Sequence, residues 1–291
     1  MLYFLQSDKY EVGVESLGAE LQHFIKQDEK LELIWQADPA VWTGHAPNLF
    51  PIVGELPRQQ YTYNGKTYQM ARHGFARRKE FKLVEEQQDK LVFELTQDDE
   101  TLQQYPFKFR LLVAYKLEGN SLSVTYLVTN TDDHTSYFSL GAHPGFSVPL
   151  YAGEQYEDYY IEFEKEETLS RHLLSPEGLL SGDTERVLTQ QQVLPLRHEY
   201  FEKDALVFKR LRSEKVTLAS QTNPRRIEIT FQGFPYLGIW AKPGPSRYVC
   251  IEPWCGVAGR AGGALDIKEK EGINELRPEA TFERTIHITI L

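Results

Sequence analysis

The chain has 291 residues, 41% hydrophobic and 25% charged, so it can bury a large core as one all-β domain or as two smaller domains. Its 32 basic and 42 acidic side chains give a formal net charge of -10, which argues against general binding to nucleic acid or to an anionic membrane. The opening MLYFLQSDKYEVGVE reaches charged residues too early for a signal peptide, and no segment approaches the roughly 20 apolar residues of a membrane span. We therefore expect a cytoplasmic protein with no nucleic-acid or membrane partner.

Apolar residues at every second position predict antiparallel strands along most of the chain. A first hairpin is expected in YTYNGKTYQ, residues 61–69, because Asn64-Gly65 readily takes the positive φ angles of a tight turn. A longer hairpin is expected around Glu118-Gly119-Asn120, because apolar residues alternate on both sides of it: Phe107, Phe109, Leu111, Val113, Tyr115 and Leu117 before, and Leu122, Val124, Tyr126 and Val128 after. Later strands are expected in four more runs: 225–231, 236–240, 246–252 and 281–291.

Helical periodicity is scarce in this sequence. The stretch 38–49 contains two prolines, and the polar stretch 184–192 offers at most one short helix. The 12% of aromatic residues and the frequent Gly and Pro agree with an all-β fold, a large antiparallel β-sandwich. Because no repeat, linker or shift in composition divides the chain, we expect a single domain over residues 1–291.

Four segments combine titratable residues with Gly, Pro and aromatic residues, as expected where backbone bends around a polyhydroxylated ligand: 72–81, 139–150, 200–208 and 250–259. The last one contains the only two cysteines, Cys250 and Cys255, which allow a disulfide or a metal pair in principle. Two thiols without nearby histidines provide too few ligands for a closed zinc site. We therefore expect reduced, partly buried thiols, and neither a metal nor another cofactor.

The order of His73, His143, Asp204 and Glu252 in an all-β chain of this length resembles the galactose mutarotase family. The HGFAR and EPWCG segments are similar to the LacX-type branch of the aldose 1-epimerase-like proteins, and HGFAR also resembles the hexose-6-phosphate mutarotases. The resemblance covers nearly the whole chain. It implies a β-supersandwich with a cleft on one concave sheet, and interconversion of the α and β anomers of a hexose without a cofactor.

The same resemblance assigns the chemistry to two residues. His143 protonates the ring oxygen while Glu252 removes the proton of the anomeric hydroxyl; the open aldehyde then rotates about C1–C2 and recloses with the roles exchanged. These residue types also suit the reaction on chemical grounds. An imidazole titrates near neutral pH, and a carboxylate in a partly dry cleft has its pKa raised toward that range, so that each can give and take a proton.

Binding roles are expected for a further set of side chains, each with a structural alternative. His73 and Asp204 are candidates for contacts to sugar hydroxyls, although both can simply stabilise turns. Trp254, Phe75 and Phe146 are candidate platforms for the apolar face of a pyranose, although large aromatic residues usually belong to the core.

A sugar phosphate is a second possible substrate beside a neutral sugar. Arg77 is the first candidate for a phosphate contact, because its planar guanidinium matches phosphate oxygens, and Arg58 is the second. Alternatively, Arg77 holds a carboxylate of the cleft in place, and the neighbouring Arg78 and Lys79 belong to a solvated face.

Two departures from the better-known galactose mutarotases put galactose itself in doubt. Those proteins carry an Asn-Arg pair upstream of the first histidine, whereas Leu49 follows Asn48 here, and their strand-end histidine is commonly followed by an aromatic residue and Asn rather than by Pro144-Gly145. Two other functions remain open: a glycoside hydrolase that uses Glu252 and Asp204 as its carboxylate pair, and a non-catalytic carbohydrate-binding or sugar-sensing module. The sequence leaves the oligomeric state open.

Overall fold

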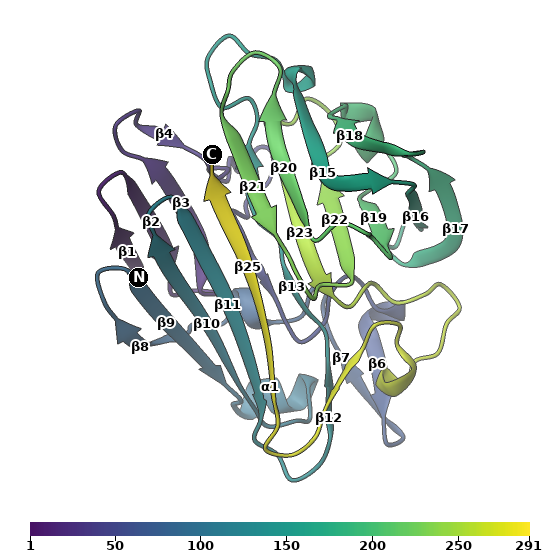
Figure 1. Ribbon diagram of the computed structural model, residues 1–291. Coiled ribbons are helices and arrows are strands. Elements are labelled where there is room, and N and C mark those ends of the chain that lie inside the picture. Colours follow the sequence, from purple (N-terminus) through teal and green to yellow (C-terminus); the bar gives the residue numbers. More distant parts are fainter.

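The computed structural model describes residues 1–291, and two large antiparallel sheets stacked on each other form most of it (Figure 1). The nine-stranded sheet has the order β18 (Gln191–Pro195), β15 (Tyr159–Glu167), β20 (Lys215–Ser220), β21 (Arg226–Thr230), β25 (Thr281–Ile290), β11 (Ser121–Asn130), β10 (Phe109–Glu118), β9 (Lys90–Thr96), β8 (Lys82–Glu86). The second sheet has the order β17 (Leu180–Arg186), β16 (Ser170–Leu174), β19 (Leu206–Lys209), β22 (Tyr236–Trp240), β23 (Tyr248–Cys255), β13 (Leu140–Ala142), β5 (Asn48–Leu49), and β14 (Gly145–Ser147) also pairs with β23. The predicted all-β sandwich is therefore confirmed.

Smaller elements complete the fold. A four-stranded sheet consists of β1 (Leu2–Gln6), β2 (Tyr10–Glu15), β3 (Glu20–Lys26) and β4 (Leu31–Glu32), and two short pairs consist of β6 (Gln60–Tyr63) with β7 (Lys66–Gln69) and β12 (Ser136–Phe138) with β24 (Asn274–Leu276). The helical segments are α1 (Asp99–Gln104) and five 3-10 turns: η1 (Pro57–Gln59), η2 (Ala76–Arg78), η3 (Tyr156–Asp158), η4 (His198–Phe201) and η5 (Ile267–Glu269). No helix has the length and apolar character needed to cross a membrane.

Both predicted hairpins are present. Strands β6 and β7 are joined by Asn64-Gly65, whose φ angles are +47° and +75°, and β10 and β11 are joined by Gly119-Asn120, with Gly119 at +61°. The apolar set on β10 and β11 is buried at every second position, as the period of two requires. Phe107 lies just before β10 but is buried with this set.

The short helix considered for residues 184–192 is wrong, because this stretch contributes to β17 and β18. Each is the outermost strand of its sheet, so most of its side chains are exposed and polar, and the backbone pairing with a single neighbour determines the conformation. The helix α1 had no counterpart in the sequence prediction. It is fixed at its start by Asp98, whose side chain accepts a hydrogen bond from the backbone N–H of Thr101, while the hydroxyl of Thr101 accepts one from the backbone of Asp98.

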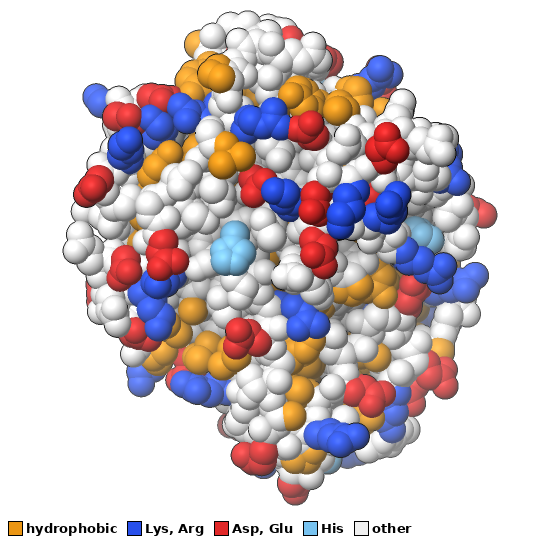
Figure 2. Space-filling view, viewed as in Figure 1, with side chains coloured by type: hydrophobic (Ala, Val, Ile, Leu, Met, Phe, Trp, Pro, Cys, Tyr) orange, Lys and Arg blue, Asp and Glu red, His pale blue; other side chains and the backbone are white.

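The outer face of the nine-stranded sheet is polar. Hydroxyl groups pair across β11 and β25, at 2.8 Å between Ser121 and Thr289 and at 2.9 Å between Thr125 and Thr285. Figure 2 shows acidic and basic side chains interspersed on this side of the molecule rather than gathered by sign. The opposite side of the sheet contributes to a continuous core of 66 buried residues. This alternation is the reason for the two-layer structure, since each sheet covers its apolar face with the other.

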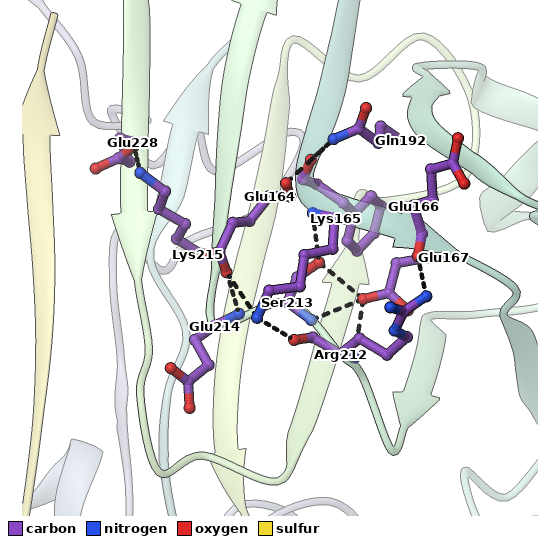
Figure 3. Close-up of polar contacts among 11 residues, drawn as sticks. Glu164, Lys165, Glu166, Glu167, Gln192, Arg212, Ser213, Glu214, Lys215 and Glu228 are labelled. Carbon is purple, nitrogen blue, oxygen red and sulfur yellow. Dashed lines mark hydrogen bonds and ion pairs between the residues drawn. The ribbon is translucent and has the colours of Figure 1, made fainter.

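A buried carboxylate fastens the end of β15 to the loop before β20 (Figure 3). Glu167 is only 2% exposed and accepts hydrogen bonds from the backbone N–H of Arg212 at 2.9 Å and of Ser213 at 2.8 Å, and from the Ser213 hydroxyl at 2.7 Å. Three donors compensate for the loss of water around the charge. Polar contacts of Glu167 therefore hold the loop at this end of the sheet, together with the packing of Leu211 against the core.

Candidate active site

Strand β23 presents one of its two faces to the site, because alternate residues of a strand face opposite sides. One set packs into the main core: Val249, Ile251 and Cys255. The other set faces away from that core: Tyr248, Cys250, Glu252 and Trp254. Two residues of this second set, Glu252 and Trp254, line a cavity of about 220 Å³ on the outer side of the eight-stranded sheet.

The neighbours of β23 carry glycines where the Trp254 indole needs room. Gly238 of β22 pairs with Glu252 of β23, and a Cβ at Gly238 would lie 2.5 Å from the Trp254 ring. On the other side, a Cβ at Gly141 of β13 would lie 2.6 Å from the same ring. Any larger residue at either position would displace the indole, so the backbone itself shapes the floor of the cavity.

His143 lies at a break between β13 and β14, both of which pair with β23. At this break Pro144 accepts a hydrogen bond from the Ile251 N–H at 3.1 Å, so His143 is held beside the reactive face of β23. Its Nε2 lies 3.1 Å from Oε2 of Glu252. The two atoms are close but not aligned for a hydrogen bond, and both Oε2 of Glu252 and Nδ1 of His143 have no hydrogen-bond partner.

His73 enters the cavity from a tight turn that only an unusual backbone can make. Its φ is +66° and that of Gly74 is +73°, and Phe50 O lies too close to Gly74 for a side chain at that position. Nδ1 of His73 accepts a hydrogen bond from the Gly54 N–H at 3.1 Å, so a neutral ring carries its proton on Nε2. Burial, followed by the charge of His143, holds the pKa of His73 well below its usual range. His73 is therefore a neutral donor.

Asp204 lies at the mouth of the cavity in a turn after η4, with φ of +67°. Its Oδ1 accepts from the Ala205 N–H at 2.7 Å and its Oδ2 lies 3.5 Å from Nη2 of Arg72. Both side chains of this ion pair are partly exposed, at 41% for Arg72 and 30% for Asp204. The pair therefore presents a charged, hydrogen-bonding rim that a polar ligand can reach.

Only one residue of the Arg77-Arg78-Lys79 cluster reaches the cavity. Arg77 donates through Nη2 to the Arg72 carbonyl at 3.1 Å, and its buried Nε has no partner. Burial lowers the pKa of Arg77. Arg78 is exposed, and Lys79 forms ion pairs with Asp98 and Glu100 beside α1. The expected solvated face is therefore present at Arg78, whereas the Lys79 side chain is only 15% exposed and is held by its ion pairs.

The structure brings six of the predicted site residues to the wall of this one cavity: His73, Arg77, His143, Asp204, Glu252 and Trp254. Phe75 is not among them. It is 6% exposed and packs edge-on against Phe50 in the core, because the turn at His73-Gly74 directs consecutive side chains to opposite sides. Phe146 is likewise a core residue, and Arg58 borders a different hollow. The expectation that Phe75 stacks on the sugar is therefore corrected.

The sequence prediction missed three aromatic or charged lining residues: Trp42, Arg72 and Trp240. Trp42 stacks on the His143 ring at 5.2 Å between centroids, and Trp240 meets the same ring edge-on at 5.8 Å. Gly145 leaves space for Trp42, since a Cβ there would lie 2.9 Å from the indole. Arg72 could have been predicted as a site residue because it directly precedes His73. Nothing in the irregular stretch 38–49 indicates that Trp42 reaches His143.

Burial dominates the electrostatics of the central pair. It lowers the pKa of His143 to about 3 and raises the pKa of Glu252 well above its usual range. Both shifts favour the uncharged form of the group, as desolvation requires. Between these two pKa values the pair holds one proton, which lies on Glu252 in the open cavity.

The cysteines lie on opposite faces of β23, which keeps them apart. Both are free thiols, with Cys250 at 0% and Cys255 at 2% exposure, so they are more deeply buried than expected. One part of the sequence reasoning is wrong: the thiols do not lack a histidine neighbour, because His143 comes within reach of Cys250 through strand pairing.

Comparison with known proteins agrees with the site. The family model for Aldose 1-epimerase matches residues 1–264. The chain belongs to the aldose 1-epimerase family. It is 35% identical over 295 aligned positions to the LacX protein of Lactococcus lactis subsp. lactis, covering 99% of this chain and 98% of that one. Membership in the aldose 1-epimerase family supports a mutarotase-type function and a sugar substrate.

Solved structures of this family have the same fold. A galactose mutarotase related enzyme from Lactobacillus acidophilus superimposes with a TM-score of 0.95 at 35% identity, over 100% of this chain and 97% of that one. A galactose mutarotase-like protein from Lactobacillus casei also gives 0.95, at 32% identity over the full length of both chains. The galactose mutarotase-like sandwich implied by the sequence resemblance is therefore confirmed.

Proposed function

We propose that this protein is an aldose 1-epimerase that interconverts the α and β anomers of a hexose, with His143 and Glu252 as its acid–base pair. The observation that carries the proposal is the 3.1 Å contact between these two side chains in the wall of a cavity of about 220 Å³. Both groups exchange protons readily, and one pyranose ring can touch both across such a distance. Family membership supports the same reaction class.

The pair needs only one proton to complete the reaction. In the open cavity this proton lies on Glu252, and a small rotation of the carboxyl group aligns it for transfer to His143. His143 then protonates the ring oxygen while the Glu252 carboxylate takes the proton of the anomeric hydroxyl, so the ring opens and the pair again holds one proton. After rotation about C1–C2, reclosure on the other face of the aldehyde runs the same transfers in reverse.

The residues around the pair are suited to bind the sugar. The Nε2–H of His73 and the Arg72–Asp204 rim offer donors and acceptors for ring hydroxyls. Trp254 and Trp240 border the cavity and provide apolar surface for the C–H face of a pyranose. Binding therefore uses loops and aromatic floor, while proton transfer uses the strand residues.

Hexose 6-phosphates are the alternative substrate within this proposal. Arg77 supports it, because its buried Nε lacks a partner and Arg72, whose carbonyl it contacts, is partly exposed at the rim. Catalytic efficiency for glucose and galactose anomers should be compared with that for their 6-phosphates, in the parent and in Arg77→Ala. A preference for phosphorylated sugars that disappears in the variant supports a phosphate contact, whereas equal efficiencies leave Arg77 as a scaffold residue.

A hydrolase needs two carboxylates that flank a scissile bond. Asp204 and Glu252 are the only carboxylates in the cavity wall. Asp204 is already held by Arg72 and by its own turn, and Glu252 is in contact with His143. These contacts favour ring opening over hydrolysis.

Polarimetry of freshly dissolved α-glucose and α-galactose, with and without protein, tests the proposal directly. We expect Glu252→Gln and His143→Asn to lose about a hundredfold or more of the catalysed rate, because each removes a group that transfers protons in both directions. Sugar binding by these variants, measured by calorimetry, should be largely retained. A Glu252→Gln protein that still accelerates mutarotation at near the parental rate would remove Glu252 from the mechanism.

A further inference from the structure

The proposed acid–base pair, His143 and Glu252, lies close to a third potential metal ligand, the thiol of Cys250. Strand pairing places the break at His143-Pro144 opposite Ile251, so that His143 lies between the side chains of Cys250 and Glu252. A ring nitrogen of His143, Sγ of Cys250 and a carboxylate oxygen of Glu252 all lie within 4.8 Å of one another. Cys250 and Glu252 lie on β23, and His143 lies between two short strands that pair with β23, so strand pairing brings the three residues together.

This cluster leaves polar atoms unsatisfied in the interior. Cys250 is 0% exposed, Glu252 1% and His143 8%. Nδ1 of His143 and Oε2 of Glu252 have no hydrogen-bond partner, and Cys250 is a free thiol. Buried polar atoms in native proteins are nearly always paired, so the unpaired Oε2 of Glu252, which lies 3.1 Å from Nε2 of His143 and near a free thiol, points to a ligand that these three side chains can share.

The chemistry of the donors identifies the ligand class. A thiolate, an imidazole and a carboxylate together select zinc and similar borderline or soft divalent ions over magnesium and calcium, which prefer oxygen. Metal bonds of about 2.0 to 2.3 Å would bring tetrahedral donors to roughly 3 to 4 Å from one another, so small side-chain movements close the site. The fourth position would face the cavity, since His143 and Glu252 line it.

We propose that His143, Cys250 and Glu252 bind one Zn²⁺ or Cd²⁺ ion, and that this ion switches off the enzyme by occupying both members of the acid–base pair. On binding, the Cys250 thiol and the Glu252 carboxyl group each release a proton to solvent, and neutral His143 contributes a lone pair. The two resulting negative charges match the dication, which offsets the unfavourable field of Arg72 and Arg77. The inhibition rests on the proposed function; the metal binding does not.

Cd²⁺ titration of the reduced, chelator-free protein tests the binding by ultraviolet absorption. A cadmium–thiolate bond produces a charge-transfer band that oxygen and nitrogen ligands do not, so the exposed Asp132-Asp133-His134 cluster cannot imitate it. We expect a band that saturates at one equivalent of Cd²⁺. It should disappear in Cys250→Ala and persist in Cys255→Ala, the matched control on the other face of β23. His143→Asn and Glu252→Gln should weaken the binding.

Absence of the band in the folded parent, or its persistence in Cys250→Ala, would overturn the proposal. Cys250→Val provides a second test if the alanine variant does not fold, because valine fills the space of the thiol without a ligand atom. In the mutarotation assay, Zn²⁺ should inhibit the parent reversibly on addition of EDTA, and the activity that remains in Cys250→Ala should be insensitive. A thiolate band without any mutarotase activity would refute the proposed function and leave the metal site standing.

Discussion

Replacing Trp42 by leucine tests whether aromatic packing orients the ring of His143, the proposed acid, and stabilises its protonated form. His143 has no hydrogen bond at Nδ1, so its ring is positioned by its neighbours: Trp42 stacked at 5.2 Å, Trp240 edge-on at 5.8 Å and His73 edge-on at 5.7 Å. An indole face also stabilises a cation placed over it. Trp42 should therefore favour the protonated imidazole that the ring-opening step requires.

The size of the effect follows from the stack. A cation over an indole within about 6 Å is stabilised by roughly 2 kcal/mol when water is excluded, and by about half of that at an exposed site. Because each 1.4 kcal/mol corresponds to a factor of ten in rate, losing the stack in Trp42→Leu should lower kcat by about tenfold to thirtyfold. Trp42→Phe keeps an aromatic face over His143 and should recover most of this loss.

Steady-state polarimetry of both variants gives kcat and KM separately, and thermal unfolding shows whether the fold is intact. The main-chain carbonyl of Trp42 accepts a hydrogen bond from the Trp35 indole at 2.9 Å, and this bond survives both substitutions. The expected result is a fall in kcat with a smaller change in KM. A Trp42→Leu variant with parental kcat, or an equal loss in Trp42→Phe, would show that stacking does not support the acid.

Three further outcomes follow from the site. The plot of kcat/KM against pH, corrected for spontaneous mutarotation, should show no loss near pH 6.5, because the pKa of His143 is lowered to about 3. The value should fall only as pH rises through the raised pKa of Glu252. A loss of activity on acidification through pH 6.5 would contradict a pair that shares one proton. Lys270 is buried and its pKa is lowered to about 7, so the folded protein must bury a charged amine below that pH but not above it. In urea unfolding, the free energy of unfolding of the parent should therefore rise relative to that of Lys270→Met between about pH 7 and 9. A difference that stays constant over this range would refute the reasoning. Gly238→Ala should cost about 1 to 3 kcal/mol of unfolding free energy and lower activity, because its Cβ meets the Trp254 ring, and unchanged chemical denaturation would show that the indole can move.

The strand pattern could be predicted where one face of a strand is buried, as in β10 and β11, because burial imposes a period of two on the sequence. It could not be predicted for β17 and β18, which lie at sheet edges and carry mostly exposed polar residues. The helix α1 is only six residues long, and a single capping contact at Asp98 determines its start. Such short elements depend on one or two contacts rather than on a repeated pattern.

The residues of the proposed site could be predicted where the sequence around them resembles a known family. They were harder to predict where packing alone brings a side chain to the cavity. His143 and Glu252 come together because β13, β14 and β23 pair, which a sequence does not state but a family resemblance implies. Whether an aromatic residue belongs to the core or to the cavity is decided by the surrounding backbone. Phe75 and Trp254 both follow a titratable residue by two positions and both are buried, yet the turn at Gly74 directs Phe75 into the main core, while the glycines beside β23 leave room for Trp254 in the cavity wall.

The proposed base Glu252 is carried by β23 and the proposed acid His143 by the break between two strands that pair with β23, whereas His73 and Asp204 come from turns with positive φ. The two parts of the site therefore depend on different backbone elements. Exchanging the turns alters which hydroxyl groups a ligand must present, while the pairing of β13 and β14 with β23 still places the His143 break beside Glu252. The segment that carries Trp42 must stay, because the His45 carbonyl accepts a hydrogen bond from the Gly145 N–H at this break, at 2.8 Å. A single scaffold can in this way acquire a new sugar preference by loop replacement while it keeps the reaction.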